Sequence, residues 1–530
     1  MKNQLFTILI LLLIVNVNLI LSCPEYPTPI DIDQNDPLLV KAYAQVDELI
    51  QKKMKENRIL SFIATIVYQD QIVWSKTYGN VDPLDPKSPP LTLDNNVRIA
   101  SITKVFTDLM MYQLRDKGVI SLDDPISKYY PEFSVRDLYN TKREISFREL
   151  ASHQSGLPRE VPCDFNLLPT DNCTEEVIIE NLSKTFLILP QYKQTHYSNL
   201  GIALLGRTLA KAAKTNYEKY IFEKILEPLG MLNSSFSYEK VKDHMAIGVD
   251  LYPNGTYTHA GILELGWGTP MGGLFSTARD MSKFMSFWMN ENPDVLDSSS
   301  VQEALSPIAL VNDGQTAYGT PFEMYYDSVN SIWMKSKAGA LDGYRSQMAL
   351  VRPLKLGMFF SSLMYISSPD VFTRDAMKII IPVYEALLLE KNSKPQNMNP
   401  EEGDQHKRHH PDQIPDQELV GQYADNEGGV FVVDNSTGYL LANFGDNNNY
   451  NVSHFSFDFP HVKRIQLVNT DPYECVFVED GSNYELVYFN FGEKQSVQVM
   501  GQTMYLISKN PNDPLPSTSL NLKPNKRLNI

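Results

Sequence analysis

Cysteine and positive charge are both in short supply in this 530-residue chain, and each shortage argues against a class of protein. There are four cysteines, with no CxxC pair and no HExxH motif, which argues against a zinc finger or an iron–sulfur protein. Lysine and arginine total 47 against 63 aspartates and glutamates, so the formal net charge is −16. Because no Lys/Arg block offsets this charge, the chain repels phosphate backbones, and we expect no nucleic-acid partner.

Long hydrophobic runs are also missing once the N-terminus is passed. Lys2 is followed by an almost wholly apolar stretch over residues 5–21 that ends just before Cys23, a pattern typical of a secretory signal peptide. We therefore predict a signal peptide over residues 1–22 and a secreted or secretory-pathway location. A short membrane anchor and a lipoprotein box that lipidates Cys23 are the alternatives. No later stretch reaches 18 apolar residues, so we expect no stable membrane span after cleavage.

Export permits disulfide bonds, and the four cysteines allow three pairings. Cys163 and Cys173 bracket a short loop and are the natural pair, whereas Cys475 has either Cys23 or no partner. Closing so short a loop contributes about 3 kcal/mol at most. Asn-x-Ser/Thr sequons fit a glycosylated secretory protein, although an Asn-rich chain also contains them by chance. They lie at Asn172, Asn181, Asn233, Asn254, Asn435 and Asn451.

Hydrophobic periodicity predicts a large α/β (α+β) domain over residues 23–391. The chain is 43% apolar and 21% charged, which is the composition of a globular protein. Strand pairs near both ends of this segment enclose a long, mainly helical stretch rich in Gly and Pro turns, so we expect one sheet built from both ends. Helices are predicted over 38–56 and 370–390, and strands over 61–68, 72–78, 347–352 and 356–364.

A polar segment then separates a second, smaller domain. Residues 392–416 carry almost no apolar side chain and are predicted to be a solvated linker. Histidines in this segment could bind a metal, but a charged linker composition explains them, and we assign no metal site. Residues 417–510 alternate short β-type runs with Asn/Gly/Asp turns, which predicts an all-β barrel or sandwich, and residues 511–530 form a polar tail. The histidines are His406, His409 and His410.

Ser101 and Lys104 form an SxxK motif at the start of a predicted helix. Unpaired N–H groups and the helix dipole favour developing negative charge at this position. Lys104 lies three residues on and on the same face, where a desolvated lysine can lose its proton and act as a general base. A capping serine beside a surface lysine would give the same pattern, and Ser237 and Lys240 also match it. The motif alone therefore identifies no site.

Two further motifs follow in a fixed order. Tyr197-Ser-Asn199 precedes an apolar helix, and Lys337-Ala-Gly339 runs toward the predicted strand at 347–352. In this order and spacing the chain resembles the serine β-lactamase and penicillin-binding-protein family. It is most similar to class C β-lactamases, D-Ala-D-Ala carboxypeptidases and β-lactamase-like esterases. The resemblance covers about residues 40–390.

The resemblance implies a fold and a chemistry. The fold is a β-lactamase/transpeptidase-like sheet flanked by helices with a helical subdomain, and the C-terminal part is similar to the barrel appended to some members. The chemistry is covalent acyl-enzyme catalysis that needs no metal or cofactor. By analogy, Ser101 is the nucleophile and Lys104 takes its proton. Tyr197 passes a proton to the leaving group and later activates water.

The same resemblance implies how substrate is held. Asn199 orients the substrate and Lys104, and Lys337 supplies positive charge for an anionic substrate group or for lowering the pKa of Tyr197. The oxyanion hole of the family corresponds to the N–H groups of Ser101 and Ala340, with Gly339 beside them. The third motif departs from Lys-Thr-Gly, because Ala338 lacks the hydroxyl that helps to bind a β-lactam carboxylate. We therefore do not expect antibiotic hydrolysis to be the physiological role.

Together these features predict a secreted serine hydrolase acting on an ester, amide or small peptide, and the expected partner is therefore a small-molecule or peptide substrate. The alternative is a non-catalytic binding or scaffold protein that keeps the penicillin-binding fold. A Ser-His-Asp triad through His196 is disfavoured, because the chain has no GxSxG elbow and His196 adjoins Tyr197, so the two side chains would point apart. Oligomeric state is left open.

Overall fold

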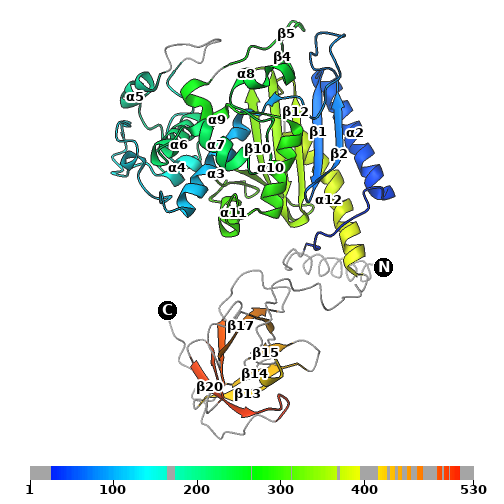
Figure 1. Cartoon of the computed structure of the whole chain (residues 1–530), viewed down its shortest axis with the longest axis vertical. Helices are drawn as coiled ribbons and strands as arrows, with labels where there is room; N and C mark the ends of the chain where they lie inside the picture. Colours follow the sequence, from blue (N-terminus) through cyan, green and yellow to red (C-terminus); the bar gives the residue numbers. More distant parts are fainter. Residues whose placement is uncertain are drawn as a thin grey trace, which may run out of the picture. The chain divides into compact units, whose positions relative to one another are not determined.

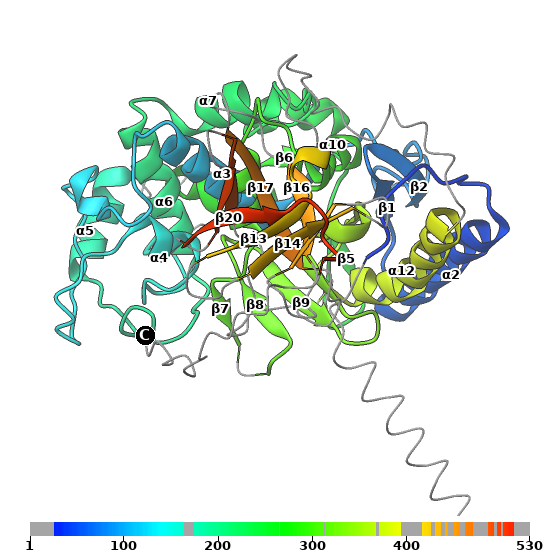
Figure 2. The same cartoon turned by 90° about the horizontal axis from the view of Figure 1, so that it is seen from below.

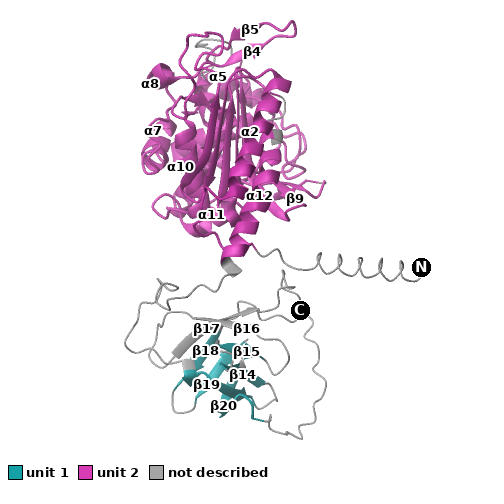
Figure 3. Ribbon diagram, turned by 90° about the vertical axis from the view of Figure 1, so that its right-hand side faces the viewer, with its two compact units in different colours: residues 1–25, 397–530 teal, residues 26–396 magenta. Residues whose placement is uncertain are grey.

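The computed structural model forms two compact units, one spanning residues 26–396 and the other containing residues 397–530 (Figure 3). The structure describes residues 26–163, 174–263, 265–311, 313–366 and 370–393 of the first unit, and segments between 416 and 513 of the second. The predicted signal peptide, nearly all of the linker, the sequon at Asn172 and the histidines at 406, 409 and 410 lie outside these residues.

An eight-stranded antiparallel sheet forms the centre of the first unit, with the order β2-β1-β12-β11-β10-β9-β8-β7 (Figure 1). β1 pairs with β12 in a register that places Phe62 opposite Ser362, so both ends of the domain meet in one sheet, as the sequence predicted. The bounds are β1 Phe62–Tyr68, β2 Gln71–Tyr78, β7 Ala309–Leu310, β8 Thr316–Tyr318, β9 Glu323–Asp327, β10 Ile332–Leu341, β11 Tyr344–Val351 and β12 Leu356–Ser362.

Strand β1 is buried on both faces of the sheet, and the alternation of its side chains shows why. Phe62 and Ile66 belong to one core cluster, whereas Ile63 and Val67 belong to another, as expected for side chains that point alternately to opposite faces. The first cluster is covered by two adjacent helices, α2 (Pro37–Asn57) and α12 (Asp370–Ser393), which lie side by side in Figures 1 and 2. α10 (Ala278–Asn290) packs on β1 and β12 from the other side.

A helical subdomain fills the stretch between the two strand pairs. Its central element is α3 (Thr103–Asp116), which is buried at every residue from 103 to 114, as a helix surrounded by others must be. The other helices are α4 Phe147–Ala151, α5 Glu175–Lys184, α6 Asn199–Ala212, α7 Tyr217–Ile221, α8 Tyr238–Val241, α9 Thr269–Gly272 and α11 Ser298–Ala304. Short strands pair as β3 (Val97–Arg98) with β6 (Phe275–Ser276), and β4 (Val249–Leu251) with β5 (Tyr257–His259).

The second unit is a closed antiparallel barrel in which β13 pairs with both β14 and β20. Tyr423, Phe431 and Phe489 are among its buried core residues. The α/β (α+β) class and the C-terminal barrel are thus confirmed. Within the described ranges, no helix combines the length and apolar content needed to cross a membrane. The strands are β13 Gly421–Ala424, β14 Val430–Asp434, β15 Leu441–Asn443, β16 Tyr450–His454, β17 Val462–Asn469, β18 Leu486–Asn490, β19 Ser496–Val499 and β20 Gln502–Ser508.

Candidate active site

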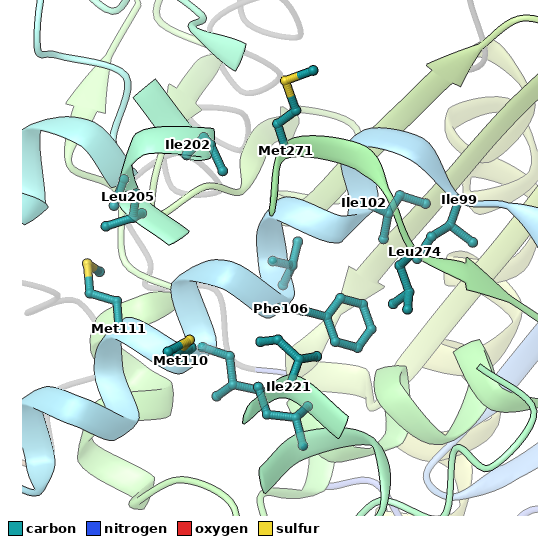
Figure 4. Close-up of a cluster of buried hydrophobic side chains, with 14 of the residues drawn as sticks. Ile99, Ile102, Phe106, Met110, Met111, Ile202, Leu205, Ile221, Met271 and Leu274 are labelled. Atoms are coloured by element: carbon teal, nitrogen blue, oxygen red, sulfur yellow. The ribbon is translucent and has the colours of Figure 1, made fainter. Parts of the chain in front are cut away.

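Ser101 lies in a single helical turn, η1 (Ala100–Ile102), that leads directly into α3. Ala100 has a φ of 48°, in the left-handed region that non-glycine residues rarely adopt, so the chain bends sharply between β3 and the helix. Below this turn, Ile102 and Phe106 belong to the buried cluster that Figure 4 draws. The same cluster includes Ile202 of α6, so the turn that carries Ser101 is supported by tightly packed apolar side chains.

Lys104 is fully buried and lies beside the serine. Its Nζ is 2.9 Å from the Ser101 Oγ and 2.6 Å from the carbonyl oxygen of Met271, in α9. Burial is the main reason that the pKa of Lys104 is lowered, and the charge of Lys337 adds to it. A lysine amine with a lowered pKa next to a hydroxyl can accept the hydroxyl proton.

Tyr197 lies among cationic side chains. Its ring centroid is 5.1 Å from the Lys104 Nζ, 4.9 Å from the Lys337 Nζ and 5.0 Å from the guanidinium carbon of Arg159. Burial by itself raises the pKa of the Tyr197 hydroxyl, but the charges of Lys104 and Lys337 outweigh it, and the net pKa is lowered. A hydrogen bond with Ser101 lowers it further. The hydroxyl is therefore placed to relay protons at the serine.

The segment that carries Tyr197 is held by its neighbours. Ser198 caps α6 by accepting from the Gly201 N–H at 2.8 Å, and its hydroxyl donates to the carbonyl oxygen of Pro158 at 2.6 Å. The buried His153 accepts the Ser198 N–H at its Nδ1, and its ring packs on Tyr197 with centroids 4.5 Å apart. His153 therefore supports the loop that carries Tyr197.

Lys337 and Gly339 precede β11, as the sequence predicted, but they lie within a strand of their own, β10, which was not predicted from the sequence. Ala338 pairs with Gln347 and Gly339 with Ser346 in the β10–β11 register. A Cβ added to Gly339 would lie 2.1 Å from the carbonyl oxygen of Ile99 and 3.1 Å from the Ser101 N. This strand therefore passes directly against the serine turn, and only glycine permits the approach.

Comparison with known proteins identifies the architecture. The sequence profile of the family named Beta-lactamase matches residues 46–370. The chain belongs to the β-lactamase family. It is similar to Beta-lactamase-like protein 2 of Dictyostelium discoideum, with 62% identity over 96% of this chain and 95% of the relative. It is also similar to Putative beta-lactamase-like 1 of Homo sapiens, with 30% identity over 63% of this chain and 67% of the relative.

Solved structures share the fold of this β-lactamase-like chain. The octameric penicillin-binding protein homologue from Pyrococcus abyssi aligns with a TM-score of 0.56 and 20% identity, covering 87% of this chain and 99% of that one. The beta-lactamase/D-alanine carboxypeptidase from Yersinia pestis aligns with a TM-score of 0.54 and 24% identity, covering 66% and 99%. At these identities the likeness concerns the fold alone.

Asn199 of this β-lactamase-like chain has a different partner from the one expected. Its amide nitrogen donates to both carboxylate oxygens of Glu160, at 3.0 and 2.9 Å. Lys104 is held instead by the Met271 carbonyl oxygen, a backbone acceptor that no sequence motif indicates. A role for Asn199 in substrate binding stays a prediction, as does the oxyanion hole at Ser101 and Ala340.

The sequence also missed Glu323, which forms an ion pair with the buried Lys337. The Glu323 Oε1 lies 2.5 Å from the Lys337 Nζ, and its Oε2 accepts the Ala338 N–H at 3.4 Å. Burial opposes the charged lysine, but the carboxylate more than compensates and raises the pKa of Lys337. The lysine charge therefore persists in the site, with its counter-ion attached.

The hydrogen bonds of Ser101 do not fit a Ser-His-Asp triad. Within the described residues, Ser101 has hydrogen bonds with Lys104 and Tyr197 and with no histidine, and the Nδ1 of His196 is buried without a partner. No group of three or more His, Cys, Asp or Glu residues within the described ranges could hold a metal ion. Cys163 is disulfide-bonded, and since its partner lies outside these ranges, the pairing with Cys173 stays a prediction.

Proposed function

We propose that this chain is an exported serine hydrolase that forms an acyl-enzyme at Ser101 and acts on an ester, amide or small peptide. The observation that carries the proposal is the fully buried Lys104 amine, 2.9 Å from the Ser101 hydroxyl. The disulfide at Cys163 and the N-terminal apolar segment support export, because disulfides persist in oxidising compartments.

In the proposed reaction, acylation uses the three motif side chains in turn. The Ser101 Oγ bonds to the substrate carbonyl carbon while its proton moves to the Lys104 Nζ. Collapse of the tetrahedral intermediate breaks the bond to the leaving group, which takes the proton through the Tyr197 hydroxyl. The acyl group remains on Oγ until Tyr197 accepts a proton from a water molecule, whose oxygen attacks the same carbon. The second tetrahedral intermediate then breaks the C–Oγ bond, and the proton returns to Oγ to restore the free serine.

A labelling experiment tests this proposal. Purified protein is treated with a fluorophosphonate probe and with a fluorescent penicillin, beside Ser101→Ala. Ser237→Ala is the matched control, because Ser237 and Lys240 repeat the SxxK spacing outside the site. We expect at least one probe to label the wild type and the control but not Ser101→Ala. Folded protein that neither probe labels would favour the non-catalytic binding alternative.

A further inference from the structure

Glu323 changes what the buried lysine of β10 can do. β9 and β10 are adjacent antiparallel strands, and their register places Glu323 opposite Ser336, next to Lys337. The lysine side chain is 1% exposed and that of Glu323 is 14% exposed, so the pair is largely shielded from water. Ion pairs at 2.5 Å in such surroundings are strong and are not readily given up to a competing anion.

The other groups around the pair add little free positive charge. Tyr318 of β8 lies opposite Glu323 in the β8–β9 register, and burial together with the Glu323 charge raises the pKa of its hydroxyl, which keeps it neutral. Arg159, over the Tyr197 ring, is 3.0 Å from Glu160 in an ion pair of its own. Lys337 and Arg159, the two cations beside Tyr197 other than Lys104, thus each have a carboxylate partner, in a buried pair for Lys337 and in an exposed surface pair for Arg159.

A substrate carboxylate would meet an unfavourable environment at this position. It would approach the Glu323 carboxylate as a like charge, and Ala338 offers it no hydroxyl to donate a hydrogen bond. Like charges brought together at a binding site are a common means of excluding a competing ligand. A neutral group in the same place is not repelled by Glu323 and does not need a hydroxyl donor at residue 338.

We propose that Glu323 is a specificity-determining residue that makes this site select neutral esters or amides and reject substrates whose leaving group carries a carboxylate. The inference rests on the proposed acyl-enzyme function and names its substrate class.

Two aryl acetates test this selection, one with a methyl ester and one with a free carboxylate on the leaving group, and release of acetate is the quantity measured for both. Methyl 3-acetoxybenzoate and 3-acetoxybenzoate release the same acetyl group, and only the second leaving group carries a carboxylate. We expect wild-type kcat/KM for the neutral ester to exceed that for the anion by about tenfold or more, after correction for uncatalysed hydrolysis. This comparison needs no variant. Equal kcat/KM values would overturn the proposal.

Glu323→Gln then tests the residue itself, because an amide oxygen can still accept from Lys337 without the negative charge. We expect the neutral-to-anionic ratio to fall by about tenfold, chiefly through the anion. Glu175→Gln is the matched control, since Glu175 also pairs with a lysine, Lys211, but about three turns along α6 from Asn199. The neutral-to-anionic kcat/KM ratio of Glu175→Gln should equal that of the wild type.

Fluorophosphonate labelling of Ser101 separates the two possible failures. Labelled protein whose substrate ratio does not change on Glu323→Gln would overturn the selection proposal and leave the hydrolase function standing. Folded wild type and Glu323→Gln that both fail to label would overturn the hydrolase function, and the selection proposal with it.

Discussion

Asp108 lies one helical turn beyond Lys104 on α3, and both side chains are buried. Neither carboxyl oxygen of Asp108 has a hydrogen-bond partner among the described residues. Burial raises the pKa of this carboxyl well above its usual range, although the charges of Lys104 and Lys337 oppose the shift. The candidate site therefore combines a buried carboxyl of raised pKa with a lysine of lowered pKa, one turn apart on the same helix.

Asp108 makes stability depend on pH. The unfolded carboxyl releases its proton near pH 4, whereas the folded protein holds it to higher pH. Above pH 4 the folded state binds more protons, so the free energy of unfolding falls as pH rises toward the folded pKa. Asp108→Asn removes this loss. We expect the free energy of unfolding of the variant, relative to that of the wild type, to increase by up to about 1.4 kcal/mol per pH unit above pH 4, as measured by chemical denaturation. Parallel pH profiles would contradict this expectation.

Lys104→Met should abolish most of the reactivity of Ser101. The side chain is similar in length and fills the buried space, but it cannot accept a proton. We expect the rate of fluorophosphonate labelling to fall by about 10²–10⁴, the usual contribution of a positioned general base. Lys240→Met, in the second SxxK, should label at the wild-type rate. A Lys104→Met variant that melts near the wild-type temperature and labels at the same rate would rule out the base.

Lys337→Met should move the pH dependence of labelling to higher pH. Lys337 helps to lower the pKa of both Lys104 and Tyr197, and its removal also leaves the Glu323 carboxylate unpaired. All three effects act in the same direction, because each raises the pKa of the proton-accepting groups. The second-order labelling rate measured from pH 6 to pH 10 checks this shift. Lys335→Met, on the same strand, should leave the pH profile unchanged. If Lys335→Met shifted the profile as much as Lys337→Met does, the effect would not be specific to Lys337.

Gly339→Ala should destabilise the fold as well as the site. The new Cβ would lie 2.1 Å from the Ile99 carbonyl oxygen, so β10 or the serine turn must move. We expect a loss of about 1–3 kcal/mol in the free energy of unfolding, as for other overpacked positions, together with slower labelling of Ser101. Gly118→Ala is the comparison, since its Cβ meets no atom within 4 Å and its φ of +68° affects stability alone. Equal labelling rates for Gly339→Ala and Gly118→Ala would show that the close approach is unimportant.

The catalytic candidates could be predicted because they belong to short local motifs. Ser101 and Lys104 lie at the start of one helix, and Tyr197 has a recognisable sequence context, so both motifs can be recognised from the sequence alone. Glu323 could not be found this way. It precedes Lys337 by 14 residues and reaches it only through the register of β9 and β10.

The strand that carries Lys337 shows why part of the sheet was missed. β10 buries both Ser336 and Lys337, so its burial does not follow a simple alternation of apolar and polar residues. The lysine is satisfied by a carboxylate from the neighbouring strand, which the sequence does not connect to it. β1, β2, β11 and β12 have conventional apolar runs, and these strands were predicted close to their observed positions.

The pairing of Phe62 with Ser362 also determines when the central sheet can be completed during synthesis. The two residues stand 300 positions apart, so at about 5–20 residues per second the ribosome adds the second roughly 15–60 s after the first. For that time β1 has no β12 to pair with, while the helices between them are already being made. An unpaired strand edge can pair with other nascent chains. Pairing β1 with β12 is a contact between residues far apart in the sequence, and such contacts form slowly.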